Sequence, residues 1–219
     1  MNNQLKWAVF YLFPIFIFSC NEKAGDRGIA TAIANANGAK EFSKIKSIEF
    51  TFNADKDSAH TERHWKWMPK ENSVIFYDKN DSVLFKRMDT SSAELKNLNA
   101  RFTNDEYWLI FPLHLQWDGG YTITDNDTAT GPVTEKRYHK YTVQYSGKEG
   151  FTPGDMYELY TDDNNMIQEW AFHRSAAKEP TIMTSWENYE NFNGLKIAKE
   201  HKSKDGKFRL YFTGVTVLQ

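Results

Sequence analysis

The chain has 219 residues, a length typical of one domain, and its 40% hydrophobic and 26% charged residues indicate a globular protein rather than a disordered one. Its 27 Lys and Arg residues nearly balance 29 Asp and Glu residues, and the net charge of -2 argues against a general nucleic-acid-binding protein. The single cysteine excludes an internal disulfide framework and any metal site built on several cysteines.

The first twenty residues are typical of an export signal. An apolar run from Trp7 to Phe18 follows Lys6, and it is shorter than the roughly 20 residues that a membrane-spanning helix needs. The run ends in Ile17-Phe18-Ser19-Cys20, which resembles the lipobox of bacterial lipoproteins. We therefore expect a lipoprotein signal peptide over residues 1–19 and lipidation of Cys20. The alternatives are an ordinary secretory signal with an incidental cysteine and a cytoplasmic chain with an apolar N-terminus.

The residue after Cys20 bears on location. Asn21 is not the aspartate that retains some Gram-negative lipoproteins in the inner membrane, so we expect anchoring at the outer membrane, facing the periplasm. Each buried methylene of the lipid adds about 0.8 kcal/mol of membrane affinity, and two or three chains would hold the protein stably. The polar residues 20–27 are predicted to form a tether.

The mature chain is predicted to begin with a helix and continue as strands. Residues 28–46 are rich in alanine and predict a helix that Gly38 weakens at its middle. Alternation of apolar and polar residues then predicts strands at 47–53, 61–67, 74–77 and 83–88, with Pro69 ending the second and a polar hairpin turn at 78–81.

A helical interruption follows these strands. Ser91 and Glu94 form a capping-box pattern, and residues 104–106 are predicted to cap a second segment, 107–111, which Pro112 stops or kinks. Residues 107–117 are apolar on nearly all sides, so this segment needs to be enclosed.

The remainder of the chain is predicted to be strands separated by turns, at residues 121–124, 135–145, 155–161, 166–173, 181–189, 195–202 and 208–218. About ten or eleven strands exceed what a flat sheet accommodates. The predicted fold is therefore α+β and mainly antiparallel β, a curled sheet or incomplete barrel with helices on its concave side. Residues 28–219 are predicted to form a single domain.

This layout resembles the fold of the LolA/LolB lipoprotein carriers, an incomplete antiparallel barrel closed by helices around an apolar cavity. The resemblance is carried by the strand Arg63-x-Trp65-x-Trp67, the strand Tyr157-x-Leu159-x-x-Asp162, the alternating Met166, Gln168, Trp170 and Phe172, and the pair Trp186-x-x-Tyr189 and Asn193-Gly194-Leu195-Lys196-Ile197. The segment 107–118 further resembles Gram-negative lipoproteins of unknown function. The resemblance implies a cavity for acyl chains, and Arg63 could correspond to the strand arginine that holds the carriers' helical lid.

The aromatic surplus, 16% of the chain, gives the candidate ligand site. We expect the cavity to be lined by Arg63, Trp65, Trp67, Trp108, His114, Trp117, Trp170 and Trp186. Aromatic side chains line apolar pockets, but they also simply fill cores, and this second interpretation stays open. His114 has the same two interpretations, a polar contact in the cavity or a core histidine with a hydrogen-bond partner.

Other chemistry finds little support. His60, Glu62 and His64 share a strand face, but the outer two lie about 13 Å apart along an extended strand, too far for one metal ion. Asp125, Asp127 and Thr128 could offer oxygens to calcium, yet the glycine and terminal glutamate of an EF-hand loop are missing. The sequence has no nucleophile-elbow motif, P-loop or dinucleotide fingerprint, so we expect no enzyme activity, no cofactor and no metal.

The sequence is compatible with three functions. The first is an outer-membrane-anchored, non-catalytic lipoprotein that binds a lipid or another apolar ligand in a curled-sheet cavity. The second is an anchored envelope protein with a packed core, which acts through its surface in interaction or structure. The third is a hydrolase that uses carboxylates or histidine in the concavity.

Overall fold

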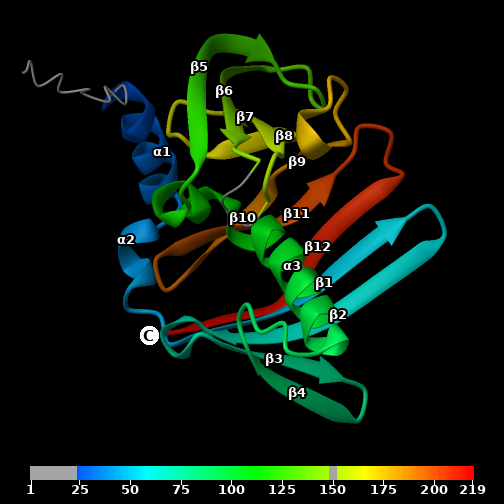
Figure 1. Cartoon of the computed structure of the whole chain (residues 1–219). Helices are drawn as coiled ribbons and strands as arrows, with labels where there is room; N and C mark the ends of the chain where they lie inside the picture. Colours follow the sequence, from blue (N-terminus) through cyan, green and yellow to red (C-terminus); the bar gives the residue numbers. More distant parts are fainter. Residues whose placement is uncertain (1–23, 148–151) are drawn as a thin grey trace, which may run out of the picture.

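The computed structural model describes residues 24–147 and 152–219, which form two antiparallel sheets, three α-helices and two short 3-10 helices, Pro69–Glu71 and Arg174–Ala176 (Figure 1). Cys20, the predicted signal peptide and residues 20–23 of the predicted tether lie outside the described residues. None of the described helices is long and apolar enough to cross a bilayer.

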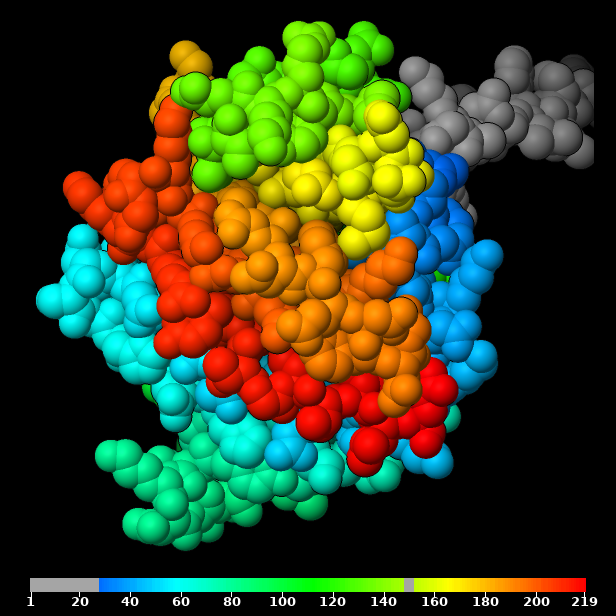
Figure 2. Space-filling view, turned by 180° about the vertical axis from the view of Figure 1, so that it is seen from behind, coloured from blue at the N-terminus to red at the C-terminus, as the bar shows by residue number. Residues whose placement is uncertain are grey.

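The larger sheet has seven strands and contains the first and the last strand of the described chain. Its order is β10 (Glu187–Phe192), β11 (Leu195–Lys202), β12 (Phe208–Leu218), β1 (Ser47–Lys56), β2 (Ala59–Met68), β3 (Ser73–Asp78) and β4 (Asp81–Lys86). Seen from behind, residues 187–218 form a continuous outer surface, and the β3–β4 hairpin projects from it as a separate lobe (Figure 2).

The smaller sheet has five strands in chain order: β5 (Tyr121–Thr130), β6 (Arg137–Tyr145), β7 (Met156–Thr161), β8 (Ile167–His173) and β9 (Ile182–Ser185). β5 is longer than the predicted strand 121–124, because it continues past a bulge between Asp125 and Thr128. A bulge adds an unpaired residue to one strand, which interrupts the alternation that sequence reasoning uses.

The chain passes from the smaller sheet to the larger one at Trp186. Sequence reasoning predicts one strand over 181–189, but Trp186 separates β9 from β10, and its backbone N–H donates to the carbonyl of Gln168 at 2.7 Å. Ser185 also remains bonded to β11, since its hydroxyl accepts from the backbone N–H of Lys202 at 3.1 Å. The two sheets therefore form one curled surface, as predicted, rather than two independent layers.

The helices differ from the prediction in their boundaries. The predicted helix 28–46 is two helices, α1 (Ala24–Ala36) and α2 (Ala39–Phe42), so α1 includes the last four residues of the predicted tether. Gly38 separates them with φ at +91°, a left-handed conformation that favours glycine. A side chain at this position would also overlap the backbone carbonyl of Gly194.

The two predicted helical segments after β4 are one helix, α3 (Ala93–Trp117). Ser92, not Ser91, is its N-cap and accepts the backbone N–H of Leu95 at 3.1 Å. The helix kinks near Pro112, which lacks the backbone N–H that would continue the ladder, and Ile110 has the non-helical φ of -137°.

α3 lies against the concave side of the larger sheet and is buried along much of its length (Figure 1). Phe102 packs on the rings of Trp65 and Trp67 of β2, and Phe111 packs on Trp170 of the smaller sheet. The helix thus fills the space between the sheets. Residues 107–117 are apolar on nearly all sides, and this position encloses them.

Candidate ligand-binding site

Two cavities lie beside α3 and share part of their walls. The smaller has a volume of about 510 Å³ and the larger about 990 Å³. Asn104, Trp108, Phe172 and Arg174 line both. The two volumes fall within the range of about 300–1,000 Å³ that is usual for small-molecule sites.

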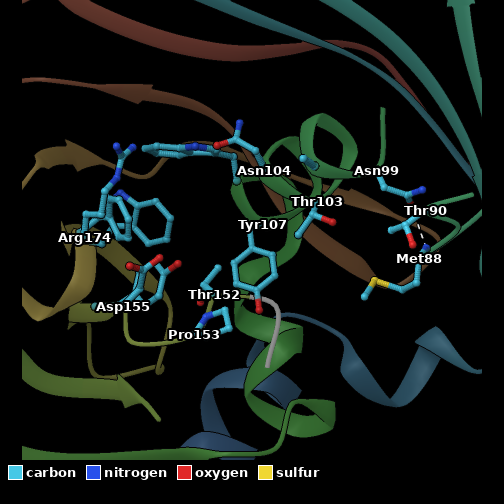
Figure 3. A pocket seen from close by; sticks show the side chains of 15 residues that line it. Met88, Thr90, Asn99, Thr103, Asn104, Tyr107, Thr152, Pro153, Asp155 and Arg174 are labelled. Carbon is cyan, nitrogen blue, oxygen red and sulfur yellow. Dashed lines mark hydrogen bonds between the residues drawn. The ribbon is translucent and has the colours of Figure 1, made fainter. Parts of the chain in front are cut away.

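One face of α3 forms a wall of the smaller cavity (Figure 3). Asn99, Thr103, Asn104 and Tyr107 are spaced by one to four residues, so the helix brings them to one side, with Met88 and Thr90 beyond them. Thr152, Pro153, Asp155 and Arg174 face them from the smaller sheet and its connections. Most of the polar residues here are uncharged, and Trp108, Tyr157, Trp170 and Phe172 add an apolar part to the lining.

The larger cavity has an apolar wall and opens among charged side chains. Its apolar wall comes from β1, β9 and β12 of the two sheets and from the end of β8; the residues are Phe52, Ala54, Phe172, Ile182, Met183, Phe208 and Leu210. Charged residues from the ends and connections of the strands also line it, namely Lys56, Asp57, Arg174, Lys204, Asp205 and Lys207. All six are exposed, so they form the rim of the cavity rather than its interior.

Trp108 lines both cavities and connects them to the aromatic core. It is 9% exposed, and its ring centroid lies 4.6 Å from that of Trp170 and 5.2 Å from that of His201. Trp186 packs on both of these rings, at 5.2 and 4.6 Å. Burial lowers the pKa of His201 to about 3, so its imidazole is neutral and functions as a core ring at neutral pH.

A buried ion pair fixes α3 to the larger sheet. The guanidinium of Arg63 donates two hydrogen bonds of 2.6 Å to the carboxylate of Asp105, and the indole N–H of Trp65 adds a third at 2.8 Å. Asp105 is completely buried, and burial raises the pKa of its carboxyl against the opposing effect of Arg63. Sequence reasoning predicted Asp105 as a helix cap, but it lies inside α3 because the helix begins at Ala93.

A second buried polar network surrounds the kink of α3. His114 is fully buried and contacts two carboxylates, Glu106 at 2.8 Å through Nε2 and Asp118 at 2.9 Å through Nδ1. Burial lowers the pKa of His114, but the charges and hydrogen bonds of these carboxylates outweigh it and raise the pKa overall. Arg87 donates to Glu106 at 2.9 Å, and the hydroxyl of Tyr107 donates to Asp118 at 2.5 Å.

The structure places the eight predicted cavity residues in different surroundings. It brings Trp108 and Trp170 to the cavity walls. Trp65, Trp67 and Trp186 are buried in the aromatic core, and Arg63 and His114 belong to the two polar networks. Trp117, which is 38% exposed, packs on Phe42 of α2.

Sequence reasoning missed most of the wall of the larger cavity. A usable signal was present in β1, where Phe52 and Ala54 continue the alternating apolar face that begins at Ile48. No comparable signal marks Met183 or Leu210, because the cavity forms only where strands from both sheets meet.

The predicted metal candidates have protein partners. His60 contacts Asp55 at 2.6 Å, and His64 contacts Glu49 at 3.1 Å, both on the neighbouring strand β1. Asp125 accepts the backbone N–H of Asp127 within the β5 bulge. Within the described ranges, no group of three or more His, Cys, Asp or Glu residues is arranged to hold a metal ion.

No protein-family model matches the chain, and no curated protein matches it by sequence. Solved structures do match. A domain named as an outer membrane lipoprotein-sorting protein, from Vibrio parahaemolyticus, aligns over 89% of this chain and 93% of that one, at 10% identity and a TM-score of 0.52. The chain shares the fold of that sorting domain. This confirms the lipoprotein-carrier fold predicted from the sequence pattern.

Two further structures align at lower TM-scores. A LolA superfamily protein from Nitrosomonas europaea is 9% identical, covers 87% of this chain and 94% of its own, and has a TM-score of 0.48. A DUF1329 family protein from Desulfovibrio piger is 6% identical, covers 86% of this chain and 92% of its own, and has a TM-score of 0.46.

Proposed function

We propose that this protein is a non-catalytic envelope lipoprotein that binds the apolar chain of a lipid in the larger cavity. The observation that carries the proposal is the cavity itself, about 990 Å³ in volume and walled by apolar side chains from both sheets and α3. Burying an apolar chain there would contribute about 25 cal/mol for each Å² of surface removed from water.

The arrangement of Trp108 supports this proposal. Its indole lines both cavities, together with Asn104, Phe172 and Arg174, so a change of its rotamer would alter both volumes. The wall also contains Met183, whose flexible thioether adapts to ligands of different shape. Such a site accommodates chains of several lengths better than it discriminates among them.

The proposed location rests on the sequence and on the lipoprotein-sorting structure. Lipid on Cys20 would anchor the protein in the outer membrane, with the cavity on the periplasmic side. The test is to compare the wild type with Cys20→Ser. Under denaturing conditions we expect the mass of the wild type to exceed that calculated for residues 20–219 by a diacylglyceryl group, with or without a third acyl chain. Cys20→Ser should retain residues 1–19 and show no such excess. A wild-type mass equal to that of an unmodified polypeptide would refute lipidation.

Ligand binding is tested by measuring the mass of the purified full chain by mass spectrometry, first under native and then under denaturing conditions. A cavity ligand is lost on denaturation, whereas lipid bound covalently to Cys20 remains. Ala54→Trp places an indole in the larger cavity and should reduce the bound ligand severalfold. Leu84→Trp, at a 67% exposed position on β4, is the matched control and should retain it.

The packed-core alternative has its own support, since Trp65 and Trp186 are fully enclosed. If native mass spectra show no ligand, and the protein takes up no added fatty acid, the binding proposal fails. An envelope protein that acts through its surface would then be the better interpretation.

A further inference from the structure

We infer that the larger cavity selects apolar chains that carry an anionic head group, which the cationic rim holds as a carboxylate or a phosphate. This inference rests on the proposed function and specifies the class of its ligand. It comes from the distribution of charge around the mouth, which differs from that of the smaller cavity.

The rim cations come from three separate places in the fold. Lys56 ends β1, Arg174 follows β8, and Lys204 and Lys207 belong to the β11–β12 hairpin. Lys56 of β1 lies directly opposite Phe208 of β12 in the sheet, and the backbone N–H of Asp57 donates to the carbonyl of Lys207. The sheet therefore holds the backbone at 56–57 next to the backbone at 207–208. The two sheets thus contribute cations to one opening.

Few of these cations are neutralised. Within residues 24–147 and 152–219, Lys56, Arg174 and Lys207 make no ion pair, and only Lys204 is paired, with Glu135. A free ligand anion could therefore be met by three cationic side chains without first displacing a carboxylate.

The two rim carboxylates do not cancel this charge equally. Asp205 is engaged in its own turn, where it accepts hydrogen bonds from the Ser203 hydroxyl at 2.7 Å and the Lys207 backbone N–H at 3.1 Å. Asp57 makes no ion pair in the described part of the chain and remains the main opposing charge. Removing the charge of Asp57 should strengthen the binding of anions, whereas removing the rim lysines should weaken it.

The apolar wall lies behind these charges. Phe208 is next to Lys207 in the chain, and Ala54 and Phe52 precede Lys56 along the same face of β1. A ligand with its chain among these side chains would place its head at the opening. The smaller cavity contains one cation, Arg174, which it shares, and one carboxylate, Asp155, and it lacks this polarity.

The test uses membranes isolated from cells that produce the full chain. Three photoactivatable probes with the same sixteen-carbon chain are compared: palmitate, hexadecyl phosphate and hexadecanol. After illumination, the protein is purified, the label per protein is quantified, and the labelled peptides are identified. We expect palmitate, the phosphate or both to label peptides of the larger cavity more than hexadecanol does.

Charge variants identify the cause. Lys56→Gln combined with Lys207→Gln should lower anionic labelling about fivefold, the effect of two solvent-exposed ion pairs, and leave hexadecanol labelling unchanged. The control, Lys79→Gln with Lys96→Gln, removes two exposed lysines away from the rim and should change nothing. Asp57→Asn should raise anionic labelling, and high salt should weaken the preference.

The outcomes separate the inference from the proposed function. Equal labelling of the cavity by all three probes, unaffected by the rim variants, overturns head-group selection but leaves chain binding in place. An equal fall for charged and neutral probes in the rim variants also overturns it, because the cations would then act on the membrane surface. Absence of cavity labelling by every probe refutes the proposed function and the inference with it.

Discussion

The Arg63–Asp105 ion pair makes a quantitative prediction about how α3 is held. Arg63→Gln would leave the fully buried carboxylate of Asp105 with two neutral donors, the indole N–H of Trp65 at 2.8 Å and the amide of Asn104 at 3.0 Å. Removing one partner of a buried pair costs about 3–5 kcal/mol, because the remaining charge stays desolvated. That is a large fraction of the stability of a typical domain, about 5–15 kcal/mol.

The assay is urea unfolding of the wild type, both single variants and the double variant Arg63→Gln/Asp105→Asn. The double variant should be more stable than Arg63→Gln alone, because its amide is uncharged and still accepts from Trp65. The sign of the pH dependence is also fixed. Burial raises the pKa of Asp105, and a raised carboxyl pKa favours folding as the pH falls.

The deficit of Arg63→Gln should therefore shrink as the pH falls, because without Arg63 the buried carboxyl takes up a proton at a higher pH than it does in the wild type. A loss below about 1 kcal/mol, or a double variant whose loss equals the sum of the two single losses, would refute this account of the ion pair.

Three further predictions concern the core and the cavity walls. Since burial lowers the pKa of His201 to about 3, its contribution to stability is present above pH 6.5 and lost as the pH falls; about 2 kcal/mol should be lost between pH 7 and 5. His201→Phe should abolish this loss of unfolding free energy at low pH, as measured by urea titrations. The control Phe212→Leu changes a neighbouring core ring that does not titrate, and it should preserve the loss. Gly131→Ala places a methyl group 2.7 Å from the carboxylate of Glu169 and should cost about 1–3 kcal/mol, so a neutral result would mean that this loop shifts freely. Met183→Glu adds a carboxylate at the mouth of the larger cavity and should lower palmitate labelling without changing the urea midpoint, while unchanged labelling would place the ligand elsewhere.

The periodic parts of the fold were predictable from the sequence, and the exceptions have local causes. Alternation located nearly all of the strands, because one face of each is buried. It failed at Trp186, where the chain changes sheets, since every residue from 181 to 189 still fits a strand. Asp105 and Glu106 resembled a helix cap because acidic residues are usual there, and only the tertiary partners Arg63 and Arg87 show that they are buried within a helix.

The site was less predictable than the fold. Sequence reasoning identified Trp108 and Trp170 from their residue type, yet the same criterion selected Trp65 and Trp186, which pack in the core. Whether an indole lines a cavity or fills a core depends on which strands meet opposite it. The rim lysines lie in ordinary polar turns, and only the curl of the two sheets brings those turns around one opening.

Two adjacent acidic residues of α3 form ion pairs with different parts of the larger sheet. Asp105 pairs with Arg63 of β2, and Glu106 pairs with Arg87, which follows β4. Moving the helix away from the sheet would expose both carboxylates and break both arginine contacts together. If the larger cavity holds the proposed ligand, we therefore expect the ligand to enter between the 180–183 segment and the 203–207 hairpin, which both line that cavity, and not by displacement of α3.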